Sequence, residues 1–271
     1  MDVNLTPLLP AIQVLVTALV VIGRDLFIDE GESRDVLAFY SLVGIGLAAA
    51  EVVLLLTGRQ ESAFNDSIVL DNFALFFTLI FLLAAALTIL SSMHYIRQLH
   101  LREGEFYALI LFATVGMILM AAANDLMVFF LALETMSIAV YVLTGMWRAS
   151  ARASEAAMKY FFMGAFATGF LLYGIALIYG STGSTNLTQI SAYMLDQPNE
   201  WPLYLIGGGL LLLIGFAFKI GAVPFHFWVP DVYEGAPTPV TGFMSVAVKA
   251  AAFAAWARIL MYKLSPLESD W

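Results

Sequence analysis

Three of the four lysines of this chain, Lys159, Lys219 and Lys249, lie inside long apolar segments, and Glu134 lies in a fourth such segment. A charged side chain at the centre of a bilayer costs roughly 2.5 to 3.5 kcal/mol on insertion scales, so four oppose insertion by on the order of 10 to 14 kcal/mol if they stay charged and unpaired. Such groups usually face a partner or water. An acid and several amines in apolar segments therefore indicate ion transport.

The composition is that of a polytopic membrane protein. Hydrophobic residues make up 61% of the 271 residues, and the mean hydropathy is +0.87, far above an ordinary soluble domain. The formal net charge of -9 argues against nucleic acid as a partner. Because the chain contains no cysteine, it supplies no thiolate for an iron–sulfur cluster or a zinc site. We expect this chain to bind no cofactor and no metal.

The apolar residues fall in blocks near the ~20 residues that a helix needs to cross hydrocarbon. The first block has no basic flank and no small-residue cleavage site after it, which favours a retained span over a signal peptide. We therefore predict an all-α fold with about eight transmembrane helices, at residues 6–24, 36–57, 72–95, 105–122, 125–147, 153–180, 202–229 and 238–262.

The basic residues near the ends of these spans predict an orientation. Six arginines lie in the loops after spans one, three and five, whereas Arg59, Arg258 and Lys263 fall on the other side. The positive-inside rule then places those three loops inside and the N-terminus outside.

The seventh span is predicted to be discontinuous. As one helix, residues 202–229 would be about 40 Å long, which exceeds the hydrocarbon thickness. Gly221 and Pro224 follow Lys219 in FKIGAVPFHFW, and proline removes a backbone donor and disfavours a helical residue before it. In transporters, a broken helix exposes free backbone groups and helix ends to an ion path. A simple packing kink is the alternative.

Glu134 and Lys219 both fall near the middle of their spans, so their side chains could meet. Closing such a pair stabilises both charges, whereas separating it in a dry environment favours the neutral forms. A pair that opens and closes would therefore change the proton affinity of the lysine. A static structural salt bridge is the alternative, and it would be weak evidence for stability.

Four further groups complete the set of titratable residues in apolar segments. Lys249 lies near the middle of span eight, and His226 follows the predicted break. Histidine titrates near neutral pH and suits a proton relay between lysines, although a lone histidine is more often structural. Lys159 lies nearer a loop, so snorkelling to the interface is an alternative for it. Glu51 has no evident partner, and we leave it outside the site.

Three runs of sequence resemble a known family in the family's order. They are NDLMVFFLALETMSIAVYVLTG, EAAMKYFFMGAFATGFLLYGIALIYGSTG and FKIGAVPFHFWVPDVYEGAPTPVTGFMSVAVKAAAF. They resemble the proton-translocating membrane subunits of respiratory complex I and their relatives in Mrp-type antiporters. The resemblance implies three ancillary helices in 1–104, the first antiporter-like five-helix repeat in 105–263, and a loop in 264–271 toward a second, inverted repeat. That repeat is missing here, so we interpret the chain as a fragment, an incomplete subunit or a split form that does not conduct alone.

The same resemblance implies roles for individual residues. Glu134 matches the family's span-five glutamate and Lys219 the lysine at the broken helix, a pair proposed to drive proton uptake. Lys159 matches the span-six lysine. His226 and Lys249 match the relay that passes the proton toward the centre of the subunit.

The activity implied is proton pumping coupled to quinone reduction elsewhere in an NADH:quinone oxidoreductase. FMN, iron–sulfur clusters and quinone are then expected in other subunits. The expected partners are the other membrane-arm subunits and the lipid bilayer, in an energy-transducing membrane of the bacterial plasma membrane type. Two alternatives stay open: a subunit of a multisubunit cation/proton antiporter, and a scaffold whose buried charges only fix helix register.

Overall fold

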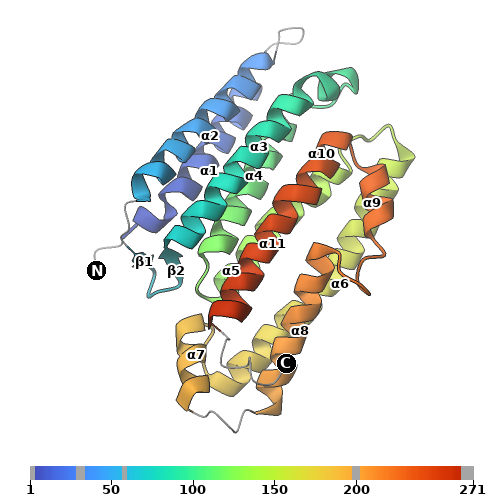
Figure 1. Ribbon diagram of the computed structural model, residues 1–271. Coiled ribbons are helices and arrows are strands. Elements are labelled where there is room, and N and C mark those ends of the chain that lie inside the picture. The colour runs from blue at the N-terminus through green and yellow to red at the C-terminus, as the bar shows by residue number, and fades with distance from the viewer. Residues whose placement is uncertain (1–3, 29–33, 57–59, 197–201, 264–271) are drawn as a thin grey trace.

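Long helices that run roughly along one direction form the molecule (Figure 1). The computed structural model describes residues 4–28, 34–56, 60–196 and 202–263. Within these ranges, eight helices are long and apolar enough to cross a membrane, which confirms the predicted all-α membrane fold. These candidate spans are Thr6–Asp25, Asp35–Leu55, Asn72–Gln98, Glu103–Ala122, Leu126–Thr144, Ala151–Thr182, Leu203–Ile220 and Thr238–Leu260.

The N-terminal half of the bundle is packed around α4. A 3₁₀ turn (Thr6–Leu8) leads into α1 (Leu9–Asp25), which is followed by α2 (Asp35–Leu55), α3 (Asn72–Gln98), α4 (Glu103–Ala122) and α5 (Leu126–Thr144). Helix α4 packs against α1, α2, α3 and α5 and is the most enclosed of the spans. A Cβ added to Gly116 of α4 would lie 2.6 Å from the backbone nitrogen of Met136, so a small residue there permits the close approach of α4 and α5.

One end of the bundle carries short elements that the sequence analysis did not predict. Strands β1 (Glu61–Ala63) and β2 (Ile68–Leu70) form an antiparallel hairpin, and α7 (Leu187–Asp196) lies at the same end (Figure 1). Asn124 connects them, because its amide donates to the backbone oxygen of Asp66 at 2.8 Å and to the hydroxyl of Thr188 at 3.0 Å. Asp125 follows and caps α5 by accepting from the backbone of Met127 at 2.8 Å, which fixes where that helix starts.

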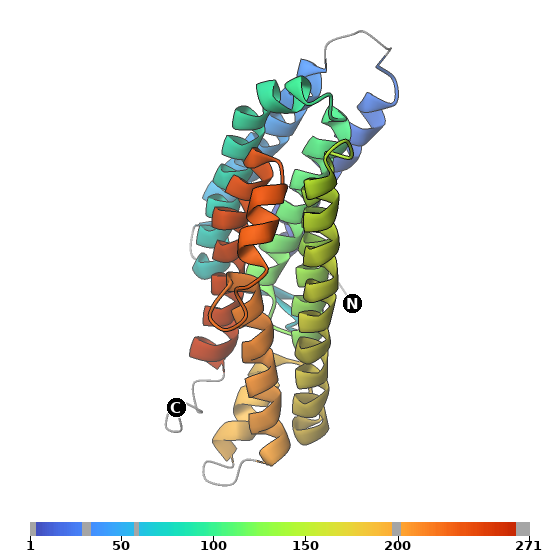
Figure 2. The same ribbon diagram turned by 90° about the vertical axis from the view of Figure 1, so that its right-hand side faces the viewer.

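Helix α6 (Ala151–Thr182) runs along most of the bundle and supports two shorter helices (Figure 2). Helix α8 (Leu203–Ile220) packs along one part of it and α9 (Val229–Gly235) along the other. A Cβ on Gly174 of α6 would lie 2.8 Å from the backbone oxygen of Gly208, and one on Gly235 would lie 2.5 Å from the Cβ of Ala156. Small residues therefore set both contacts, as is usual between membrane helices.

The predicted break in the seventh span lies at Gly221. Helix α8 ends at Ile220, and Gly221 follows in the left-handed conformation with φ of 71°, which glycine adopts at little cost. The amide of Ala222 donates back to the carbonyl of Ala217 at 2.8 Å and closes the helix end. A turn that includes Pro224 then leads to α9, so the span ends at 220 rather than 229.

The last span changes helix type along its length. It comprises α10 (Thr238–Phe243), a π-helical segment (Met244–Val248), α11 (Lys249–Trp256) and a second π-helical segment (Ala257–Lys263). Such π segments occur frequently at functional sites, and Lys249 directly follows the first of them. Arg258, which the sequence analysis counted among loop charges, is 5% exposed and forms an ion pair with Asp71. The charge is therefore neutralised inside the bundle rather than presented on a loop.

Candidate functional site

Lys219 lies buried in the last turn of α8, just before the break. Its side chain is 4% exposed, and within the described ranges no carboxylate forms an ion pair with it. Its Nζ instead lies 5.3 Å from the centroid of the Tyr141 ring and 5.5 Å from that of the Tyr160 ring. A desolvated cation–π contact contributes about 2 kcal/mol or more. Two aromatic faces therefore hold the ammonium group.

Glu134 lies on α5, two helical turns before Tyr141, and is half-buried. Its Oε1 accepts a hydrogen bond of 2.9 Å from the Thr168 hydroxyl of α6. Thr168 and Lys219 line the same small cavity between α5, α6 and α8, whose volume of about 10 Å³ is close to the space that one water needs. The structure thus brings the acid and the amine to one site. No ion pair joins Glu134 to Lys219 among the described residues, and Thr168 connects the acid to the cavity beside the amine.

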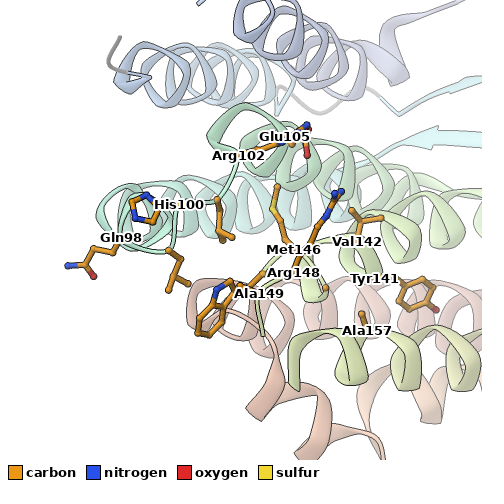
Figure 3. Close-up of a pocket in the computed structure, with 14 residues that line it drawn as sticks. Gln98, His100, Arg102, Glu105, Tyr141, Val142, Met146, Arg148, Ala149 and Ala157 are labelled. Carbon is orange, nitrogen blue, oxygen red and sulfur yellow. The ribbon is translucent and has the colours of Figure 1, made fainter. Parts of the chain in front are cut away.

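A larger pocket, also lined by Tyr141, opens at the end of the bundle formed by the α3–α4 and α5–α6 connections. It has a volume of about 710 Å³, and Arg148, Arg102 and Glu105 are among its lining residues (Figure 3). The Tyr141 hydroxyl points away from the other lining side chains (Figure 3), and a Cβ added to Gly164 of α6 would lie 2.0 Å from it. Tyr141 therefore borders both this pocket and Lys219.

Aromatic side chains also connect Lys219 to Lys249, on a different helix. Tyr160 stacks on Trp228 with ring centroids 4.6 Å apart, and Trp228 meets Tyr233 edge to face at 6.1 Å. The Nζ of Lys249 lies 5.5 Å from the centroid of the Tyr233 ring. We call Tyr160, Trp228 and Tyr233 the aromatic bridge. The sequence analysis missed it. Tyr160 lies in the run KYFF after Lys159, and Trp228 and Tyr233 lie in the run FHFWVPDVY, which follows the helix break.

Two predicted site residues lie away from the buried site around Lys219. The side chain of His226 is exposed, in the turn between α8 and α9. Lys159 is 41% exposed and its Nζ pairs with Glu155 and with Asp231 of α9, each at 2.7 Å. That position fits the snorkelling alternative, and the roles of both residues in proton transfer stay predictions.

The bundle contains a broken membrane-length helix with a buried lysine, and a neighbouring helix carries a carboxylate. This combination is typical of ion-translocating membrane proteins. Comparison with known families narrows this class. Residues 123–271 match the family described as NADH:quinone oxidoreductase/Mrp antiporter, TM. The chain belongs to this family.

Individual relatives agree with that assignment. NADH-quinone oxidoreductase subunit N of Trichlorobacter lovleyi is 48% identical over 269 residues, which cover 99% of this chain and 55% of that protein. Subunit N 1 of Herpetosiphon aurantiacus is 44% identical over 280 residues, covering 100% of this chain and 55% of that protein. The chain spans about half the length of the curated relatives it matches.

Two solved structures have a similar fold. A chain of respiratory complex I from Thermus thermophilus with bound aureothin has a TM-score of 0.73 and 38% identity, over 91% of this chain and 53% of that chain. A chain of the membrane-bound sulfane sulfur reductase, an archaeal respiratory membrane complex, has a TM-score of 0.81 and 25% identity, over 98% of this chain and 55% of that chain.

Proposed function

We propose that this chain is part of a proton-translocating membrane-arm subunit of an NADH:quinone oxidoreductase, similar to subunit N. One observation carries the proposal: Lys219 is buried at a helix break, and Glu134 lies at the same site, with no ion pair between them among the described residues. Quinone reduction takes place in other subunits, which hold FMN, iron–sulfur clusters and quinone. This chain supplies groups that take up and release protons.

The geometry suggests how these groups act. The Lys219 ammonium has two aromatic faces but no direct anionic partner among the described residues. Movement of Glu134 toward it stabilises the protonated lysine, and movement away, in a dry environment, favours release of the proton. The pocket beside Tyr141 lies at the end of the bundle formed by loops three and five, which the basic residues predict to be inside. Protons enter from this side, reach Lys219 and continue to Lys249.

The proposal also includes contacts with other membrane-arm subunits and a location in the bacterial plasma membrane. Large apolar side chains on the outside of the bundle, such as Leu54, Phe166 and Leu203, are more than two-thirds exposed and face lipid or other membrane-arm subunits. The named relatives are bacterial, which supports the bacterial plasma membrane as the location. We place the inverted second repeat in the part of the relatives' length that this chain does not cover.

The test is proton pumping by the complete complex in membrane vesicles. Lys219→Ala and Glu134→Gln should each remove pumping linked to quinone reduction while the complex still assembles. Glu51→Gln is the matched control, because Glu51 is also an acid within a membrane-length helix but lies on α2, outside the site. Normal proton stoichiometry in the Lys219 or Glu134 variant would contradict the proposal.

A cation/proton antiporter subunit is the second candidate, because the matching family also includes Mrp antiporters. Mild purification from the native membrane separates the two. Flavin and iron–sulfur proteins should travel with a complex I subunit, whereas other antiporter subunits, and exchange that depends on sodium, would favour the second candidate.

A further inference from the structure

The aromatic bridge runs without interruption from the buried Lys219 to the half-buried Lys249. Tyr160 lies under the ammonium of Lys219, and Tyr233 lies under that of Lys249, with the indole of Trp228 between the two tyrosines. The three residues come from α6, the end of the turn after the break, and α9. Contacts within the protein interior therefore connect two amines that lie on separate helices.

Two hydroxyl groups of the bridge have unused hydrogen-bonding capacity. The hydroxyl oxygens of Tyr160 and Tyr233 are buried, and no protein group in the described ranges hydrogen-bonds to either of them. Leaving a buried hydroxyl without a partner is unfavourable, and such groups are commonly satisfied by bound water or serve a functional role. Each of the two belongs to a ring beside one of the lysines.

Trp228 is held differently. Its indole nitrogen donates to the backbone oxygen of Phe218 at 3.1 Å, one residue before Lys219. The indole is therefore fixed at the helix break, and its only polar hydrogen is already used. Trp228 acts as a spacer that holds the two tyrosines in place, and the hydroxyls of Tyr160 and Tyr233 remain as the groups that can exchange protons.

We propose that Tyr160 and Tyr233, with buried water, carry the proton from Lys219 to Lys249. This rests on the proposed function. The Lys219 ammonium gives one proton to water or to the Tyr160 oxygen, and that hydroxyl releases its own proton onward. Water and Tyr233 repeat the exchange, and the neutral amine of Lys249 becomes an ammonium group. The side chain of His226 is exposed and lies outside this path.

Phenylalanine variants of the complete complex test the hydroxyls alone, because phenylalanine keeps the ring that faces each lysine. The double variant Tyr160→Phe with Tyr233→Phe should pump protons at least about a hundredfold more slowly, the loss expected for one well-placed proton-transfer group. Tyr107→Phe is the matched control: Tyr107 of α4 is as buried as Tyr160 and its hydroxyl also has no described partner, but its ring is not among those that face Lys219 or Lys249 in the described part of the chain. A double variant that pumps as fast as this control overturns the proposal.

A second readout separates proton transfer from packing. Fluorotyrosine at position 160 makes the hydroxyl more acidic with almost no change in shape, so it should shift the pH dependence of the pumping rate toward acid. An unshifted pH profile overturns the proposal, even where a phenylalanine variant assembles poorly. Lys219→Ala in the otherwise unchanged complex separates failure of the proposed function from failure of the tyrosine path. If it pumps normally, the proposed function fails, whereas if it is inactive and the double variant is normal, the tyrosine path alone fails.

Discussion

Replacing Asp71 with alanine should destabilise the bundle by about 4 to 6 kcal/mol. The guanidinium of Arg258 donates to the two carboxylate oxygens of Asp71 at 2.8 and 2.7 Å and to the backbone oxygen of Ala121 at 2.6 Å. Removing the carboxylate leaves a buried charge without its anion, which costs about 3 to 5 kcal/mol. Asp71 also caps α3 by accepting from the backbone of Ala74 at 2.7 Å, which contributes about 1 kcal/mol.

Two further variants separate the contribution of the buried ion pair to this loss of stability from that of the helix cap. Asp71→Asn keeps a good capping group but removes the charge, so it should cost about 1 kcal/mol less than alanine. Arg258→Met should cost less than Asp71→Ala, because the side chain of the remaining Asp71 is 23% exposed, whereas the side chain of Arg258 is only 6% exposed. Reversible unfolding by SDS in mixed micelles, followed by tryptophan fluorescence, measures each free energy. A loss below about 1 kcal/mol for Asp71→Ala, or strictly additive effects in the Asp71→Asn, Arg258→Met double variant, would refute the assignment of a coupled buried pair.

Glycine substitutions test the helix contacts with the same assay. Gly208→Ala would place its Cβ 2.8 Å from the backbone oxygen of Gly174 and should cost about 1 to 3 kcal/mol. Gly209→Ala, with nothing within 4 Å of the new atom, should instead stabilise by about 0.5 to 1 kcal/mol, and equal effects would contradict the packing of α6 on α8. Gly164→Ala, with its Cβ 2.0 Å from the Tyr141 hydroxyl, should displace that ring and slow proton pumping; an unchanged pumping rate would show that Tyr141 does not border the proton path.

Sequence alone predicts the membrane helices well, because hydrocarbon requires long apolar segments and satisfied backbones. The break at Gly221 was also predictable, since glycine and proline act through local backbone geometry. The hairpin β1–β2 and α7 were not predicted, because such short elements depend on tertiary hydrogen bonds such as those of Asn124. The π-helical segments on either side of α11 have no distinct composition that the sequence analysis could use.

Some residues of the candidate site could likewise be predicted from the sequence, and others could not. Charged residues in apolar segments stand out, so Glu134, Lys219 and Lys249 could be proposed as site residues from their type and position. Tyr160 and Trp228 are aromatic residues in apolar or mixed segments, where they look like ordinary core residues. Their stacking depends on how α6 packs against the helix break, which spacing along the chain does not reveal.

The central claim is that Lys219 gains and loses a proton during turnover, and Lys219→Arg tests it most directly. Arginine keeps the positive charge and the contact with aromatic faces, but it does not deprotonate in proteins. The measurement is the number of protons pumped per quinone reduced by the assembled complex in vesicles. We predict that the Lys219→Arg complex assembles and does not pump through this subunit. A normal proton stoichiometry in this variant would show that only a fixed charge is needed at this position, and would contradict the account.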